Sequence, residues 1–224
     1  MAEVILDEVE VRVLGVLVEK EKTTPEHYPL TLNALTNACN QKSNRNPVVC
    51  FDEKTVVRVL DGLREKELVR QLSGAEMRVP KYYHLCREKL ELAEGPLTAL
   101  AILMLRGPQT LGEIRGRSQR MFEFADLGQV EQTLGTLEDR EAGAFVRLLP
   151  RMPGFKESRY AHLLAGEPEV PTPPAETTTS VEAATLEVRA ENERIAALET
   201  EVASLKDELA ELRREFGDFR QQFE

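Results

Sequence analysis

The chain has 224 residues, 42% of them hydrophobic, and a formal net charge of −10 at pH 7. It has no apolar run near the roughly 20 residues that span a membrane, and its acidic N-terminus, MAEVILDEVEV, is not a signal peptide, so the composition favours a cytoplasmic protein without a membrane partner. The three cysteines (Cys39, Cys50 and Cys86) lack CxxC spacing, so we expect reduced thiols rather than a disulfide or a metal site.

The acidic charge belongs to the C-terminal part of the chain. Residues 1–90 carry 14 basic and 14 acidic side chains, residues 91–165 carry 9 and 10, and residues 166–224 carry 6 and 15. Proteins that bind nucleic acid through phosphate contacts usually present a basic face. In this nearly neutral N-terminal part, such a face has to come from local clustering.

Three helices and a hairpin are expected in residues 1–90. The helices begin at side chains that can cap them, Asp7, Thr31 and Asp52, and run to about Lys22, Gln41 and Glu67. The segments LVRQL and MRVPKYYHL then form two strands around Gly74. Pro80 lacks the amide proton that a central strand needs, which predicts an edge strand.

The same order of elements recurs in residues 91–165. PLTALAILMLRG is almost wholly apolar and predicts a helix that is buried on most of its surface. A short helix begins at Thr110, and a third begins at Asp126 or Leu127 and runs to Glu141. AFVRLL and ESRYAHLL form a second hairpin, with RMPGFK at its tip.

Four matched segments indicate that the chain contains one small unit twice. Val56, Leu60 and Leu63 are matched 74 positions later by Val130, Leu134 and Leu137, and Tyr82-Tyr83-His84-Leu85 is matched 78 positions later by Tyr160-Ala161-His162-Leu163. Thr31-Leu32-x-x-Leu35 recurs as Thr110-Leu111-x-x-Ile114, and Val11, Leu14 and Leu17 recur as Leu97, Leu100 and Leu103. Matches that keep their order indicate a duplication. The order of three helices and a hairpin is the plan of a winged helix-turn-helix domain.

A coiled coil is expected at residues 181–224, after a linker rich in Pro, Thr and Glu at 166–180. Apolar residues follow 3-4 spacing over about six heptads, with β-branched residues at one core position and Leu at the other, which favours a parallel homodimer. The candidate dimer contacts are Val188, Ile195, Leu198, Val202, Leu205, Leu209, Leu212 and Phe216. Packing onto another protein and a solvated single helix are the alternatives.

The chain contains no catalytic or cofactor motif of the GxSxG, HExxH, GxxxxGK[ST] or Gly-rich dinucleotide type. His84 and His162 occupy equivalent places in the two hairpins, which favours a packing or hydrogen-bonding role over catalysis. We therefore expect neither an enzyme nor a bound cofactor.

Residues 1–90 contain candidate DNA contacts. In a winged helix, the third helix enters the major groove and the hairpin reaches the flanking backbone. Arg and Asn can read base edges, while Lys and Thr suit phosphates. The candidates are Lys42, Asn44, Arg45, Lys54, Thr55, Arg58, Arg78 and Lys81. Glu53, Asp61 and Glu65 share the helix, so an ordinary solvated surface is the alternative.

A second basic group lies in the segment IRGRSQRMF, which contributes Arg115, Arg117 and Arg120. These side chains could bind phosphates of DNA or RNA, or an acidic partner protein. The alternative is that they form ion pairs with the neighbouring carboxylates of Glu113, Glu123 and Asp126.

Three stretches closely resemble the YceH family of bacterial proteins, a group of unknown function: EKEKTTPEHYPLTLNALTNACNQKSNRNPV, PKYYHL and LRGPQTLGEIRGRSQRMF. The resemblance covers about residues 4–165. It implies tandem winged helices in a bacterial cytoplasmic protein, and it implies no ligand, activity or functional residue.

Together these patterns predict a mainly α protein with small β hairpins. We expect winged-helix domains at 1–90 and 91–165, a linker at 166–180 and a coiled-coil helix at 181–224. The expected function is non-enzymatic DNA binding of a transcription-regulator-like kind, by a homodimer. The alternative is a protein–protein adaptor, similar to segregation and condensation protein B, whose winged helices would bind a partner protein instead of DNA.

Overall fold

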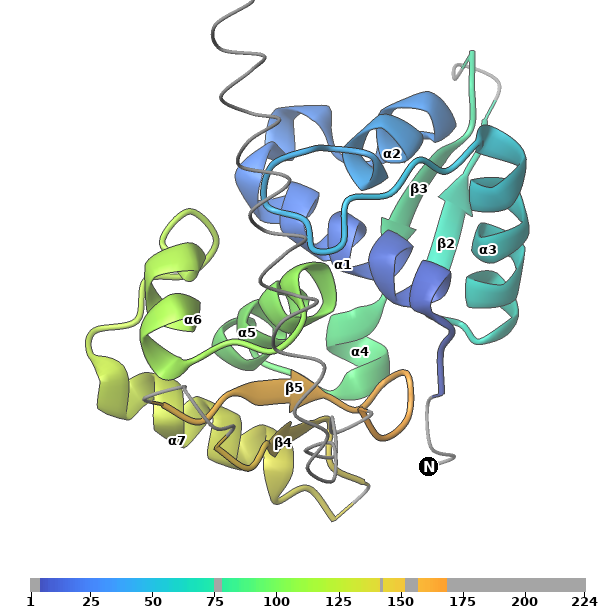
Figure 1. Cartoon of the computed structure of the whole chain (residues 1–224). Coiled ribbons are helices and arrows are strands. Elements are labelled where there is room, and N and C mark those ends of the chain that lie inside the picture. The colour runs from blue at the N-terminus through green and yellow to red at the C-terminus, as the bar shows by residue number, and fades with distance from the viewer. Residues whose placement is uncertain (1–4, 75–77, 142, 152–156, 169–224) are drawn as a thin grey trace, which may run out of the picture. The chain divides into compact units, whose positions relative to one another are not determined.

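The computed structural model describes residues 5–74, 78–141, 143–151 and 157–168, all of which belong to one compact unit (Figure 1). This part of the chain is mainly helical and carries two small antiparallel sheets, so the expected α+β class is confirmed. The expected coiled coil, with its candidate dimer contacts from Val188 to Phe216, and the tip of the second hairpin at 152–156 lie outside the described residues.

The first half of the described chain contains three α-helices and three strands. In order these are α1 (Glu8–Thr23), the 3-10 helix η1 (Pro25–His27), β1 (Leu30–Thr31), α2 (Leu32–Cys39), α3 (Glu53–Glu65), β2 (Val69–Leu72) and β3 (Lys81–His84). Asp7, Thr31 and Asp52 cap α1, α2 and α3 as expected, each accepting a hydrogen bond from a backbone N–H of the first turn.

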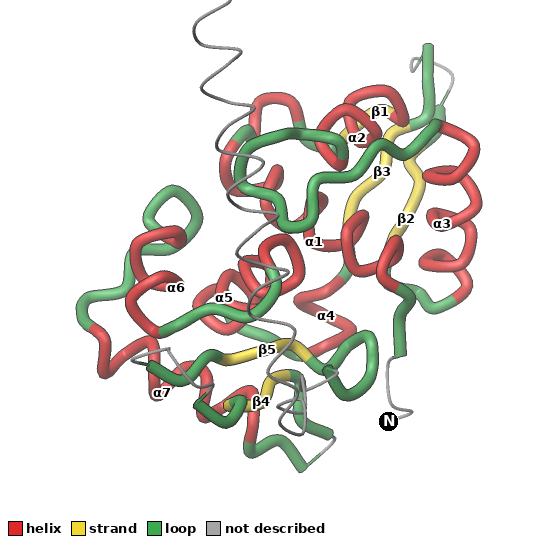
Figure 2. Tube along the Cα trace, viewed as in Figure 1, coloured by secondary structure: helices red, strands yellow, loops and turns green. Residues whose placement is uncertain are grey.

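The sheet of this half differs from the expected hairpin. Its strand order is β1-β3-β2, with both pairs antiparallel, so β3 is the central strand (Figure 2). The prediction that Pro80 lies in an edge strand is wrong, because β3 begins only after Pro80, at Lys81, and both of its edges are paired. The two-residue strand β1 was too short for the hydrophobic pattern to indicate.

The second half repeats this order. It contains α4 (Cys86–Leu90), α5 (Glu94–Arg106), α6 (Leu111–Ser118), α7 (Leu127–Glu138), β4 (Val146–Leu148) and β5 (Tyr160–His162). Thr110 and Asp126 cap α6 and α7. Every residue of α5 from Leu97 to Leu105 is buried, as its apolar sequence predicted. The short helix α4, which joins the two halves, was not expected.

The matched sequence positions occupy equivalent places in the two halves. Leu30 pairs with Tyr82 across the first sheet, and the matched residues Gln109 and Tyr160 pair across an isolated bridge beside the second. The inward-facing residues of α3 and α7 are equally buried: Val56, Leu60 and Leu63 in one, Val130, Leu134 and Leu137 in the other. The two halves therefore share this backbone pairing and this pattern of side-chain burial.

The two halves meet where α1 packs against α5, the most extensive helix–helix contact among the described elements. Nine consecutive residues of α1, Glu10 to Val18, are buried, because α1 also contacts α2 and α3. Gly15 lies at this interface, where a Cβ atom would stand 3.1 Å from the side chains of Leu105 and Met104. The two helices therefore approach closely because residue 15 has no side chain.

Candidate nucleic-acid interface

A concave basic surface lies between the two halves. It surrounds a cavity of about 400 Å³ formed by the C-terminal end of α1, the loop after α2, the last turn of α5 and α6. Its charged lining residues are the cations Lys20, Lys42, Arg106, Arg117 and Arg120 and the carboxylate Glu19. We call this set the basic cavity.

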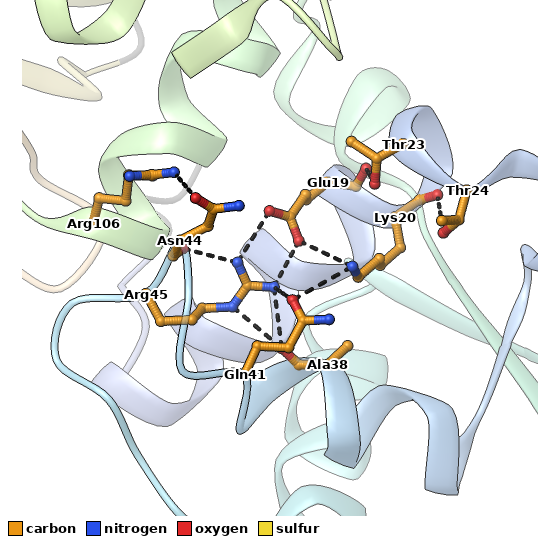
Figure 3. Close-up of polar contacts among 9 residues, drawn as sticks. All are labelled: Glu19, Lys20, Thr23, Thr24, Ala38, Gln41, Asn44, Arg45 and Arg106. Atoms are coloured by element: carbon orange, nitrogen blue, oxygen red, sulfur yellow. Dashed lines mark hydrogen bonds and ion pairs between the residues drawn. The ribbon is translucent and has the colours of Figure 1, made fainter. Parts of the chain in front are cut away.

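Arg45 forms the wall behind this cavity and does not reach its surface. The residue is 6% exposed, and its guanidinium forms two hydrogen bonds to the carboxylate of Glu19, of 3.0 and 2.6 Å (Figure 3). The expectation that Arg45 is an exposed DNA contact does not fit this position. The sequence could not show the pairing because the partner lies 26 residues away.

The other hydrogen bonds of Arg45 hold the loop after α2. Its Nε and one terminal nitrogen donate to the carbonyl of Ala38, at 3.2 and 3.0 Å, and its other terminal nitrogen donates to the carbonyl of Asn44. Ala38 is in the last turn of α2, whose carbonyls have no partner within the helix. Arg45 therefore closes the C-terminal end of α2 and fixes the loop on α1.

The same loop is bound to α5. Asn44, which adopts a left-handed backbone conformation with φ 60°, accepts a hydrogen bond from Arg106 (Figure 3). The backbone N–H of Asn46 donates to the carbonyl of Leu105 at 2.9 Å. These contacts place Lys42 and Asn44, from the first half, beside Arg117 and Arg120, from the second.

The electrostatic balance of the basic cavity is positive. Glu19 is already paired with Arg45 and lies 3.7 Å from the Lys20 ammonium, so its charge is offset before the other cations are counted. Burial and the nearby guanidinium of Arg117 lower the pKa of Arg106 from its ordinary value. Within the described part of the chain, Lys42 and Arg120 form no hydrogen bond or ion pair. An anionic ligand would relieve this repulsion.

The three arginines of IRGRSQRMF serve different roles. Arg115 donates to the backbone carbonyls of Phe124 and Ala125 and does not line the cavity. Arg117 lies 3.6 Å from Glu113, as the ion-pair alternative predicted, but also faces the cavity. Arg120 is exposed at its edge.

The remaining candidates belong to a different surface. Lys54 and Arg58 are exposed one turn apart on α3, Thr55 is partly buried beside them, and Arg78 is exposed before β3. Lys81 is half-buried at the start of β3, opposite Leu72. No residue of α3 lines the basic cavity, and Figure 1 shows α3 and α6 at opposite ends of the described unit. The structure thus divides the predicted DNA contacts of residues 1–90 into two groups.

Lys20 and Arg106 complete the basic cavity, although no sequence pattern marked them. Both occupy the last turns of helices, where cations are favoured by the helix dipole, and this explains their presence without any ligand. Only the packing of α1 against α5 brings them together.

Comparison with known proteins places the chain in a family. A family model described as "Protein of unknown function, DUF480" matches residues 6–155. The chain belongs to this family. It is 57% identical over 184 residues to a UPF0502 protein of Geobacter sulfurreducens, covering 82% of each chain. It is 59% identical over 181 residues to a UPF0502 protein of Geotalea uraniireducens, covering 81% of each, and 51% identical over 185 residues to one of Opitutus terrae, covering 80% of each.

These relatives confirm the expected membership of an uncharacterised bacterial family, and none of their names states an activity. Among the described helices, none is long and apolar enough to cross a membrane. Within the same residues, His, Cys, Asp and Glu side chains form no group of three or more that could hold a metal ion.

Proposed function

We propose that this member of the DUF480 family is a non-enzymatic DNA-binding protein of the transcription-regulator kind, built from winged-helix domains at residues 1–90 and 91–165. The order of elements supports the domain proposal. In the first half, three helices and a sheet of order β1-β3-β2 follow one another as in a winged helix. In the second half, the bridge between Gln109 and Tyr160 takes the place of the β1–β3 pair.

One observation carries the proposal: five cations surround a concave surface whose single carboxylate is already paired. A duplex presents a dense line of phosphates, and each phosphate neutralised releases condensed counterions. Lys42 and Arg120, which form no ion pair with a described residue, are placed to make such contacts. Arg45 holds the loop that carries Lys42 in place before any ligand binds, so the ligand does not have to order it.

The α3 surface is a second element of the proposal. Lys54 and Arg58 are exposed on its N-terminal half, while Asp61 and Glu65 are exposed on its C-terminal half. The positive stripe is therefore only about one turn long. A helix of this kind can enter a major groove by its N-terminal end.

The test is fluorescence anisotropy of the full chain with a random-sequence duplex, titrated at several salt concentrations. We expect binding that weakens steeply with salt, since each phosphate contact contributes about 0.9 to the slope of log affinity against log salt concentration. Replacing both Lys42 and Arg120 with Gln should lower that slope by about 2 and weaken binding of every duplex sequence alike.

A matched control distinguishes the loss of phosphate contacts from the loss of positive charge alone. Arg64 and Lys89 are exposed and already paired, with Asp61 and Glu67 respectively. Replacing both with Gln removes the same charge as the basic-cavity variant and should leave the slope unchanged. Replacing Lys54 and Arg58 with Gln reports separately on α3. Absence of binding by the full chain at low salt would refute the DNA proposal.

A specific observation favours the adaptor as the second candidate. Val57 on α3, Leu72 on β2 and Val79 before β3 are large apolar side chains that are exposed. An exposed apolar group next to α3 is suited to a partner protein. If DNA does not bind, Val57→Glu should abolish partner binding without changing the melting temperature.

A further inference from the structure

Arg12 is a buried cation that forms no ion pair within the described part of the chain, although the charge of Glu19, already paired with Arg45, acts on it. The residue is 4% exposed, and none of its nitrogen atoms forms an ion pair with a described carboxylate. One terminal nitrogen donates to the carbonyl of Pro47 at 2.6 Å, while the other, Nη1, is enclosed and has no hydrogen-bond partner among the described residues. Burial and the nearby charge of Arg45 both lower the pKa of Arg12.

Such a group costs folding free energy unless something pairs with it. A buried charge needs a counter-charge and hydrogen bonds on its remaining donors, and an unpaired donor forfeits its interaction with water. Arg45, whose charge acts on Arg12, shows the usual solution, with a bidentate carboxylate and two backbone carbonyls as partners. Arg12 has only one hydrogen-bond partner among the described residues, the carbonyl of Pro47.

A cavity of about 340 Å³ lies beside Arg12, between α1, the loop after α2, the end of α5 and the end of β5. Most of its lining is apolar: Val9, Val11, Pro47, Val49, Phe51, Met104 and Ala165. Its polar lining residues are Arg12, Asn46, His162 and, at the exposed end, Glu8. We call this set the Arg12 pocket.

His162 gives a second, independent sign of a ligand. Its Nδ1 is enclosed without a hydrogen-bond partner among the described residues, and Arg12 and His162 both contribute to the lining of one cavity. Buried polar atoms are nearly always hydrogen-bonded. A mostly apolar cavity with a few polar residues, here Arg12 and His162, is typical of a small-molecule site, in which the polar groups orient an apolar ligand.

We propose that the Arg12 pocket binds a small carboxylic acid with an apolar body, whose carboxylate pairs with Arg12 while its apolar part packs on Val49, Phe51 and Met104. A carboxylate fits better than a phosphate, because one guanidinium offsets a single charge and Glu8 would repel a second. The volume is near the lower end of the range for small-molecule sites, which favours an aromatic or branched acid over a long chain.

This site is separate from the basic cavity, because the two sets have no lining residue in common. It requires neither DNA binding nor winged-helix domains, so its test stands apart from that of the proposed function. Arg12 and Arg45 lie close enough for their charges to interact, yet only Arg12 has an unpartnered donor.

The test is a thermal-melting and calorimetric titration of the full chain with benzoate, cyclohexanecarboxylate and phenylacetate. Benzamide serves as the uncharged counterpart of benzoate, and inorganic phosphate as an anion without an apolar body. We expect at least one of the acids to raise the melting temperature with increasing concentration, since a ligand stabilises the state that binds it. Benzamide and phosphate should have no comparable effect.

Two variants test the position of the site. Arg12→Met should weaken binding of the acid by roughly tenfold or more, because charge-assisted hydrogen bonds are about twice as strong as neutral ones. It should not lower the melting temperature of the free protein, since it removes an unpaired charge and leaves the carbonyl of exposed Pro47 to water. A purely structural Arg12 would instead make this variant melt earlier.

Ala165→Phe fills the exposed end of the pocket and should block binding while leaving Arg12 in place. Arg64→Met, a substitution of the same kind on an exposed cation, should change nothing. The proposal would be overturned if none of the three acids raised the melting temperature. Equal stabilisation by benzoate and benzamide, or binding that survives both pocket variants, would overturn it as well.

Discussion

Arg45 determines the stability of the loop that carries half of the basic cavity. Its side chain is fully buried against Glu19, whose side chain is 12% exposed. Removing one member of a buried ion pair leaves the other without compensation, which typically costs about 3–5 kcal/mol. Arg45→Ala should therefore lower the free energy of unfolding by about that amount, as measured by urea denaturation.

The double variant Glu19→Leu with Arg45→Met is the control for this prediction. Replacing both charges by apolar groups avoids a lone buried charge. The double variant should therefore lose less stability than either single variant. Lys42→Ala, three residues away and exposed, should change stability by no more than about 0.5 kcal/mol. Equal losses in the single and double variants would contradict the role assigned to the ion pair.

His162 should make stability depend on pH in mildly acidic solution. Burial lowers its pKa from 6.5 to about 4. Between these values the unfolded chain binds a proton that the folded chain does not, so stability is complete above pH 6.5 and falls as the pH approaches 4. The slope contributed by one proton is at most about 1.4 kcal/mol per pH unit.

The measurement is the melting temperature or urea midpoint of the wild type and of His162→Gln across this range. Glu8, Arg12 and Glu167 also line the cavities around His162, and they are the same in both proteins, so the variant should lose the part of the slope that His162 contributes between pH 6.5 and about 4. Parallel curves for the two proteins would show that His162 does not remain neutral in the folded state.

At the scale of elements, the contact between α1 and α5 depends on Gly15. A side chain there meets Leu105 and Met104 at a distance that leaves no free space, and overpacking of this kind costs about 1–3 kcal/mol. Gly15→Leu should therefore destabilise the protein by about 1–3 kcal/mol in thermal or urea unfolding.

Gly116 offers the matched control within α6, since nothing lies within 4 Å of a Cβ atom there. The same change, Gly116→Leu, should stabilise the protein by up to about 1 kcal/mol through helix propensity. If both leucine variants gained stability, α1 and α5 would not be packed as closely as the structure describes.

For the whole molecule, we propose that the C-terminal segment makes the protein a homodimer through a parallel coiled coil. Two linked DNA-binding units would raise avidity without any new contact. Leu205→Glu places a charge at a predicted core position and should convert the dimer to a monomer in analytical ultracentrifugation. Glu208→Gln, at a flanking position, should preserve the dimer. A wild-type protein that sediments as a monomer would refute the coil as a dimer contact.

The local features of the chain could be predicted from sequence because their causes lie within a few residues. Asp7, Thr31, Asp52 and Thr110 cap helices by bonding backbone groups two or three positions later, and the apolar spacing of α3 or α7 already defines its buried face. The duplication was equally readable, since it needs only a comparison of the chain with itself.

The charged residues were not predictable in this way, because their surroundings come from distant parts of the chain. Arg45 was a candidate DNA contact and no sequence pattern singled out Arg12, yet both are buried, the first against Glu19 and the second beside Pro47. Pro80 was expected in an edge strand because it lacks an amide proton, and the two residues of β1, on the far side of β3, left no pattern that showed β3 to be central.

By itself, then, the sequence determined the longer helices, their caps and the membership of a family, all of which depend on short-range periodicity or on direct similarity. Tertiary structure alone decided which cations are available to a ligand. The packing of α1 against α5 brings Lys42 to Arg120, while contacts with Glu19 and Ala38 bury Arg45, and Arg12 is buried beside Pro47. The physical reason is that the energy of a charge depends on the groups and the solvent around it, and folding assembles those surroundings from segments far apart in the chain.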